Sequence, residues 1–119
     1  MSLHTIASQF VEFCNQGKNF DVMHTMYAPG IVSIEPNGEE TTGKTPVIQK
    51  SERFQAQNPI SSEKVRGPFL NGSDQFAVHF TFEITPKATG QRITVEEVGV
   101  YTVKDDKITR EQFFSEVPQ

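Results

Sequence analysis

A stretch near the middle of the chain alternates between large apolar side chains and polar or small ones. Every second position from residue 76 to residue 84 is apolar: Phe76, Val78, Phe80, Phe82 and Ile84. Successive side chains of a β-strand point to opposite faces of its sheet, so this pattern predicts a strand with one buried face. Another layer of secondary structure must cover a face that carries three phenylalanine rings.

Two helices are predicted at the start of the chain. Within residues 2–16 the apolar side chains recur at helical spacing: Ile6, Phe10, Phe13 and Cys14. Gly17 suits the position that closes a helix, because glycine adopts the left-handed conformation easily. Asn19 can cap a second, short helix, which ends before Pro29.

A third helix is predicted after a strand over residues 31–35. Thr45 can cap this helix, and Pro46 suits its first position, where no backbone N–H is needed. Its apolar positions are Val47, Ile48 and Phe54. The Asn58-Pro59 pair ends it.

The rest of the chain is predicted to be β-structure. Strands are expected over residues 64–70, 76–84, 92–103 and 107–114. Turn-forming pairs such as Asn71-Gly72 and Asp105-Asp106 separate them. Helices followed by hairpin-linked strands predict an α+β fold in which three N-terminal helices pack on an antiparallel sheet. The 119 residues suffice for one core, so we expect one domain over residues 1–119.

Composition narrows the possible partners and compartments. The formal net charge of −4 disfavours binding to nucleic acid or to an anionic membrane, since both require a basic surface. No apolar run approaches the roughly 20 residues that span a bilayer, and no signal peptide is recognisable. We therefore expect a cytoplasmic protein. The single cysteine, Cys14, excludes an internal disulfide, and no metal-ligand spacing suggests a metal or other cofactor.

Three segments resemble one known family. Residues 26–36 resemble the segment of SnoaL-like proteins and ketosteroid isomerases in which a strand ends in an acid followed by proline. Residues 43–46 resemble the start of their third helix, and residues 107–114 resemble their closing strand. The chain is therefore similar to the SnoaL-like family of the nuclear transport factor 2-like superfamily, and distantly similar to ketosteroid isomerase.

The resemblance implies a strongly curved sheet that forms a cone-shaped pocket for a small apolar ligand. The residues expected to line it are Phe10, Tyr27, Phe54, Val78, Phe80, Phe82, Gly99 and Tyr101. It also implies a homodimer through the outer sheet face. The residues expected on that face are His79, Thr81, Glu83, Thr94, Glu96, Val98, Val100 and Thr102.

Glu35 matches the catalytic base of the ketosteroid isomerases, because it lies directly before Pro36 at the end of a strand. The two oxyanion-binding positions of those enzymes do not match. Phe10 stands where they have a tyrosine, and Gly99 stands where they have a protonated aspartic acid. Each lost donor removes on the order of 3 kcal/mol of transition-state stabilisation, so steroid isomerisation of that kind is not expected.

Glu97 is a second candidate catalytic residue. The strand register that places Tyr101 inside also places Glu97 and Gly99 inside, with Glu97 and Tyr101 about 13–14 Å apart along the strand. Burial would raise the pKa of Glu97 and suit it to act as a general acid, with Glu35 as the base. Alternatively, Glu97 pairs with Lys50 or Arg110, or faces water at a bulge.

Four other reactive side chains have structural interpretations. His79 is expected on the outer sheet face, and His24 is expected to be partly buried beside core methionines. Cys14 is expected to be a core residue, because no basic side chain adjoins it to lower its pKa. Glu111 could reach the mouth of the pocket, but its expected place is a solvated strand end.

The sequence leaves two kinds of function open. One is a cofactor-independent isomerase, cyclase or hydrolase that acts on a small apolar carbonyl compound, with Glu35 as general base. The other is a non-catalytic small-molecule binding module or a dimeric accessory protein.

Overall fold

A computed structural model describes residues 1–116 of the chain; residues 117–119 of the expected domain lie outside this range. The helices are α1 (Leu3–Asn15), α2 (Asn19–Met26) and α3 (Lys44–Gln57). The strands are β1 (Tyr27–Ile34), β2 (Glu40–Thr42), β3 (Ile60–Asn71), β4 (Gln75–Ile84), β5 (Ile93–Lys104) and β6 (Lys107–Phe114). The α+β class predicted from the order of the elements is confirmed.

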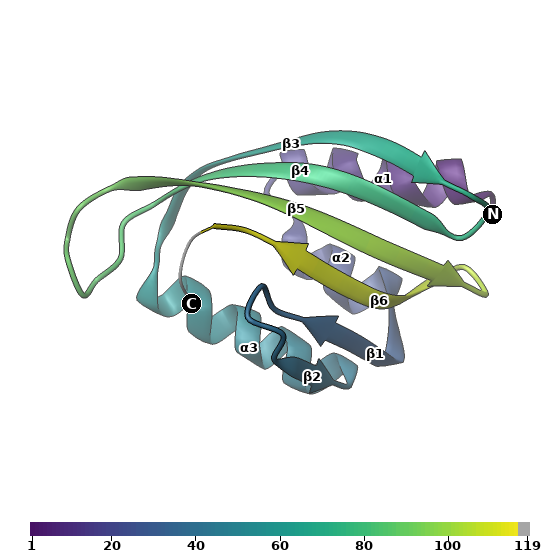
Figure 1. The fold of residues 1–119 in the computed structure, drawn as a ribbon, viewed down its shortest axis with the longest axis horizontal. Helices are drawn as coiled ribbons and strands as arrows, with labels where there is room; N and C mark the ends of the chain where they lie inside the picture. Colours follow the sequence, from purple (N-terminus) through teal and green to yellow (C-terminus); the bar gives the residue numbers. More distant parts are fainter. Residues whose placement is uncertain (117–119) are drawn as a thin grey trace.

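The strands form one six-stranded sheet in the order β2-β1-β6-β5-β4-β3 (Figure 1). The pairs are antiparallel except for β1 and β6, which run parallel. This pairing brings the first long strand beside the last one. In its register Ser33 lies opposite Glu111, and that pairing sets the geometry of the polar site described below.

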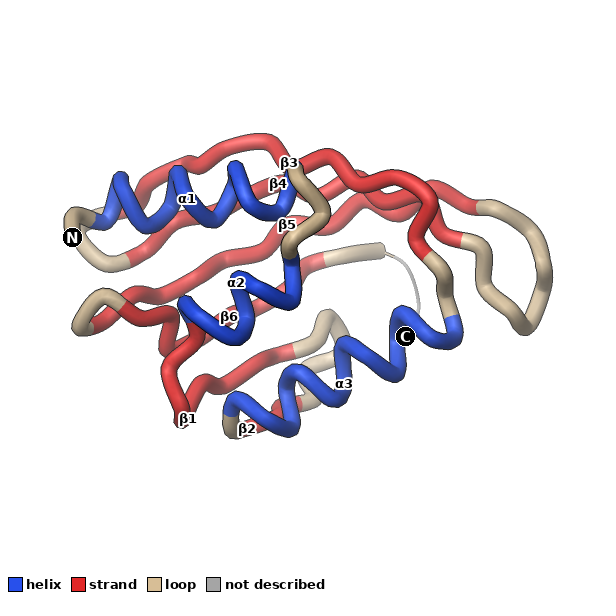
Figure 2. Tube along the Cα trace, turned by 180° about the vertical axis from the view of Figure 1, so that it is seen from behind, coloured by secondary structure: helices blue, strands red, loops and turns tan. Residues whose placement is uncertain are grey.

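All three helices cover the same face of the sheet, as the view from behind shows (Figure 2). The spacing predicted for α1 is confirmed, because its buried residues are Ile6, Ala7, Phe10 and Cys14. The apolar face of β4 meets them: Phe76, Val78 and Phe80 belong to the same buried cluster. We call the helix-covered side of the sheet the inner face and the opposite side the outer face.

Two helix starts differ from the prediction. Asn19 does not cap α2; its Nδ2 donates a hydrogen bond of 2.7 Å to Glu63 Oε2 of β3 instead. Helix α3 begins at Lys44, one residue before the expected cap, and follows Gly43, whose φ of +103° suits glycine. In both cases tertiary contacts and backbone conformation decide the helix start, rather than a side-chain cap.

The predicted turns are confirmed. Gly17 has a φ of +76° after α1, and Asp105 and Asp106 both have positive φ between β5 and β6. Two consecutive residues in this conformation are typical of the tight turns that match the twist of a hairpin. The short strand β2 was not predicted, because its three residues carry no alternating pattern.

Candidate functional site

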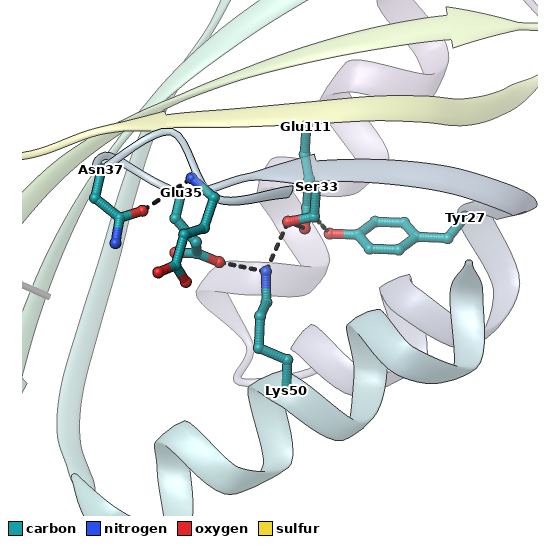
Figure 3. Close-up of polar contacts among 7 residues, drawn as sticks. Tyr27, Ser33, Glu35, Asn37, Lys50 and Glu111 are labelled. Carbon is teal, nitrogen blue, oxygen red and sulfur yellow. Dashed lines mark hydrogen bonds and ion pairs between the residues drawn. The ribbon is translucent and has the colours of Figure 1, made fainter. Parts of the chain in front are cut away.

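Glu35 lies in a tight turn directly after β1. Its backbone N–H donates a hydrogen bond of 2.9 Å to the carbonyl oxygen of Glu39, and its own carbonyl oxygen accepts one of 2.8 Å from Gly38. The Glu35 carboxylate forms a hydrogen-bonded ion pair with the Lys50 ammonium of α3 (Figure 3). Both side chains are about three-quarters buried, with exposed fractions of 22% and 24%. Solvent therefore screens this pair less than an exposed one.

A chain of hydrogen bonds leads from Lys50 into the interior (Figure 3). The Lys50 ammonium donates to Ser33 Oγ at 2.8 Å, and Ser33 Oγ donates to Glu111 Oε2 at 2.7 Å. The other carboxylate oxygen of Glu111 accepts a hydrogen bond from the Tyr27 hydroxyl. The four side chains come from β1, β6 and α3, and together with Glu35 they form what we call the polar chain.

Glu111 is the most deeply buried acid of this group, with 2% of its surface exposed. Burial raises its pKa, while the hydrogen bonds from Tyr27 and Ser33 and the charge of Lys50 oppose the rise. The sequence-based expectation of a solvated strand end was wrong. The physical reason is the parallel pairing with β1, which places β6 inside the sheet and covers Glu111 with Ser33 and Tyr27.

Glu97 lies on β5 opposite Phe80, on the inner face of the sheet. Its pKa is raised to about 7, first by burial and then by the negative charges of Glu35 and Glu111; the charge of Lys50 acts in the opposite direction. The two basic residues considered as partners of Glu97 make hydrogen bonds to other residues. Lys50 contacts Glu35, and Arg110 donates to Gln112 at 3.2 Å.

Glu35, Glu97 and Glu111 therefore form one electrostatic unit, in which Lys50 is the positive charge that acts on Glu97 and Glu111. Each of the three carboxylates is coupled to at least one of the others. Burial and the charges of Glu35 and Glu111 oppose ionisation of Glu97, which therefore keeps its proton to a higher pH than an ordinary glutamate. The arrangement can accept a proton at one carboxylate and donate one at another near neutral pH.

Most of the residues expected to line a pocket are packed against one another in the core. Phe10, Tyr27, Val78, Phe80 and Tyr101 are all buried. The ring of Phe10 lies 4.5 Å from that of Tyr101, and the Phe76 ring stacks on Tyr101 at 5.1 Å between centroids. These side chains contact one another and belong to one buried cluster.

Gly99 is the point of closest approach in this packing. A Cβ atom at position 99 would lie 2.8 Å from Tyr101 Cε2 and 3.1 Å from Phe80 Cε2. The missing side chain at this position allows a close approach to the sheet. What approaches is the ring of Tyr101, two residues further along the same strand.

Phe54 and Phe82 differ from the other expected lining residues. Phe54, expected to line the pocket, lies near the end of α3 with 49% of its surface exposed. Only the first turns of α3 bury apolar residues, Val47 and Ile48. Phe82 is partly buried at the rim of the core and stacks on Phe80 with 5.3 Å between centroids.

A hollow of about 410 Å³ lies beside Glu97, past the end of β6. Pro36, Glu97 and Phe114 contribute to its lining, together with His79 and Val98 of the outer face. The hollow therefore lies beside the part of β5 that extends past its pairing with β6, and it brings solvent close to Glu97. Pro36 places it next to the turn that carries Glu35.

The remaining candidates have structural roles. His79 lies on the outer face, as predicted, with Nε2 3.4 Å from Glu96 and Nδ1 2.9 Å from Arg66. His24 is exposed rather than partly buried, because it lies on the solvent side of α2. Cys14 is buried, and burial raises its pKa, so its thiol is not activated.

Within residues 1–116, no cluster of three or more histidine, cysteine or acidic side chains has the geometry of a metal site. None of the helices in that range is both long and apolar enough to cross a membrane.

The sequence identified some residues of the polar chain as site residues but not others. Glu35 was singled out by Pro36, and Tyr27 was expected to line the pocket. Ser33 and Lys50 carried no local signal for this site, although Lys50 was considered as a partner for Glu97. Glu111 alternates with Phe113 along β6, which is the one pattern that could have indicated an inward-facing acid.

Comparisons with known proteins agree with this fold. The family model for the SnoaL-like domain matches residues 1–115. A protein from Mesorhizobium loti, provisionally described as a SnoaL-like polyketide cyclase with "carbohydrate phosphatase" in brackets, is 42% identical. The match covers 96% of this chain and 99% of that one, with a TM-score of 0.91.

Two more distant structures share the fold alone. A provisionally assigned SnoaL-like polyketide cyclase from Jannaschia sp. CCS1 is 17% identical, with a TM-score of 0.81 over 94% of this chain and 86% of that one. A ketosteroid isomerase-like protein from Catenulispora acidiphila is 17% identical, with a TM-score of 0.70 over 92% and 83%. A comparison with curated proteins finds no match.

Proposed function

The chain belongs to the SnoaL-like domain family, and we propose that it is a cofactor-independent isomerase or cyclase acting on a small carbonyl compound. The observation that carries this proposal is the coupling of two carboxylates of unlike environment. Glu35 is paired with Lys50, whereas Glu97 has a pKa of about 7 and no such pairing among the described residues. Two titratable groups whose environments differ in this way suit the roles of base and acid.

Glu35 is the general base of the proposed reaction. Its carboxylate is partly exposed, so a substrate can reach it, and the turn over residues 35–39 holds it in place. Glu97 is the general acid. Because its pKa lies near neutral pH, a large fraction of Glu97 carries a proton that it can donate, and solvent can return that proton afterwards.

The charge of the site favours a substrate that is neutral in its ground state and gains negative charge only at its carbonyl oxygen. Glu35, Glu97 and Glu111 interact electrostatically at this site, so a phosphate or carboxylate group placed beside them would meet repulsion. A neutral ketone, ester or lactone does not. The hollow of about 410 Å³ beside Glu97 has the size of a small-molecule site. The description of the Mesorhizobium loti relative as a polyketide cyclase fits a carbonyl-bearing substrate.

A binding module without chemistry is the second candidate. The observation that favours it is the closed packing around Phe10 and Gly99, the positions that hold oxyanion donors in the ketosteroid isomerases. Native mass spectrometry of protein purified from its host would detect a tightly held ligand. A ligand that is bound equally well by Glu35→Gln, without turnover, would favour this candidate over the enzyme.

We further propose that a second copy of the chain covers the outer face. Two exposed apolar side chains lie opposite each other on adjacent strands: Val98 of β5 and Phe114 of β6 are exposed by 38% and 51%. Phe69 of β3, two strands from β5, is exposed by 59%. Exposed apolar patches of this kind mark interfaces. Light scattering at micromolar concentration should give the mass of a dimer, and Val98→Glu should shift it to the monomer. A monomeric wild-type protein would rule out this interface.

The catalytic proposal is tested by hydrogen–deuterium exchange next to a carbonyl. A panel of neutral ketones and lactones is incubated in D₂O with the wild-type protein, and deuterium uptake is followed by NMR. Glu35→Gln should lower the rate for an active compound by about 10²–10⁴-fold, the usual contribution of a general base. Glu40→Gln, an exposed acid on β2, is the matched control and should leave the rate unchanged. Equal rates in wild type and Glu35→Gln would remove Glu35 from the mechanism.

A further inference from the structure

We propose that Lys50 binds the carbonyl oxygen of the substrate and stabilises the negative charge that develops on it. This inference rests on the proposed function of the same site. The mechanism needs a hydrogen-bond donor to the oxyanion. Phe10 and Gly99 occupy the positions that hold such donors in the ketosteroid isomerases, and neither has a side-chain donor. A base alone is insufficient, since proton removal next to a carbonyl creates an enolate that needs a positive or hydrogen-bonding partner.

Lys50 has a donor left for this task. An ammonium group carries three N–H donors, and within the described residues two of them are directed to Ser33 Oγ and Glu35 Oε1. The third is available to a ligand oxygen. The side chain is about a quarter exposed, so a substrate can reach the ammonium while most of its stem is shielded from water.

The contact between Lys50 and Glu35 has the spacing that enolisation requires. In a carbonyl compound the oxygen and the acidic C–H flank one carbon atom. The group that removes the proton and the group that holds the oxygen must therefore be direct neighbours. Glu35 and Lys50 are hydrogen-bonded to each other, so a substrate that approaches them can place one atom against each.

The buried end of the polar chain keeps Lys50 in this position. A lysine side chain is flexible, and its ammonium is a point charge that needs partners to fix its location. Lys50 donates a hydrogen bond to Ser33 in addition to the one to Glu35, and Ser33 in turn donates to Glu111. Glu111 is too deeply buried to reach a substrate, so we assign it, with Tyr27, the role of a positioning residue.

The step balances in protons and electrons. Glu35 takes the proton from the carbon next to the carbonyl, and the C–H electron pair forms the new C=C bond. The carbonyl π-pair moves to the oxygen, where the Lys50 ammonium holds the resulting charge by a hydrogen bond. Glu97 then gives its proton to the carbon at which the product is protonated. Exchange with solvent returns the proton from Glu35 and restores the one on Glu97.

The test uses 2-naphthol, whose ionised form resembles an enolate and has its own absorption and fluorescence. Wild-type protein should bind naphtholate and raise the ionised fraction at pH 7. Lys50→Met should weaken that binding at least tenfold, whereas Lys50→Arg should retain part of it. Glu35→Gln should bind naphtholate at least as tightly as wild type, because it removes a negative charge and frees a lysine donor. Lys64→Met, an exposed lysine on β3, is the control and should match wild type.

The outcomes separate this inference from the proposed function. If Lys50→Met and wild type bind naphtholate equally, or if wild type binds none, the inference is wrong. If binding depends on Lys50 but no ketone or lactone exchanges deuterium, the oxyanion site stands and the proposed activity falls. If exchange depends on Glu35 and survives unchanged in Lys50→Met, the activity stands and Lys50 has no part in it. Circular dichroism of each variant checks that a loss does not come from unfolding.

Discussion

Ser33 of β1 and Glu111 of β6 lie 78 residues apart in the sequence, and a hydrogen bond of 2.7 Å joins their side chains in the interior. This bond depends on the parallel pairing of the two strands. The same carboxylate accepts the hydroxyl of Tyr27 at its other oxygen. Burial raises the pKa of Glu111, and the two hydrogen bonds oppose that rise by favouring the charged form.

The Tyr27→Phe variant tests the anionic state of Glu111. Loss of the hydroxyl removes an interaction that lowers the pKa of Glu111, so the charged form becomes less stable in the folded protein. We expect a loss of about 1–3 kcal/mol in the free energy of unfolding at pH 8 and a smaller loss at pH 5. Urea unfolding at the two pH values measures both. Tyr101→Phe, the other buried tyrosine, controls for the loss of a buried hydroxyl, and equal losses in Tyr27→Phe at both pH values would contradict this assignment.

The Gly99→Ala variant tests the packing of Tyr101 across β5. The added methyl group would lie 2.8 Å from Tyr101 Cε2, so the ring must shift within a packed core. Overpacking of this kind costs about 1–3 kcal/mol. Gly30→Ala is the matched control on β1, where an added Cβ meets nothing within 4 Å, and its stability should stay close to that of wild type. A Gly99→Ala protein as stable as the control would mean that the ring does not occupy this place.

The Glu97→Gln variant should be more stable than wild type at high pH. The folded pKa of Glu97, about 7, lies above the ordinary value of 4.5, so the folded state holds this proton more tightly than the unfolded state. The contribution of the protonated carboxyl is complete below pH 4.5 and is lost as pH rises through 7. Glutamine resembles the protonated form and does not titrate. We expect it to match wild type at pH 4.5 and to exceed it by about 1–3 kcal/mol at pH 8. A difference that is independent of pH would show that Glu97 has an ordinary pKa.

Local patterns predicted the layers of this fold but not the order of its strands. The buried face of a strand or helix can be predicted from the spacing of its own apolar residues. This holds for the alternation from Phe76 to Ile84 and for the helical spacing of α1. Which strand lies beside β6 depends on long-range pairing. No local period in the sequence encodes it, so the parallel contact with β1 was missed, and Glu111 was misplaced with it.

The candidate site was predicted in part for the same reason. Glu35 follows from its place before Pro36, and the inward direction of Glu97 follows from the register it shares with Tyr101. Lys50 and Ser33 were not recognised, because their contact requires α3 to lie over the end of β1. The close packing of Phe10, Phe80 and Tyr101 was not predicted, since a list of apolar residues gives their direction but not how closely their side chains pack.

The most direct test of the account is an NMR titration of the Glu97 side-chain carboxyl in three proteins. In wild type the midpoint should lie near pH 7. In Glu35→Gln it should fall, because a neighbouring negative charge is gone, and in Lys50→Met it should rise, because the positive charge is gone. These opposite shifts would establish that the three side chains form one coupled acid–base site. A midpoint near 4.5 that neither substitution moves would contradict it.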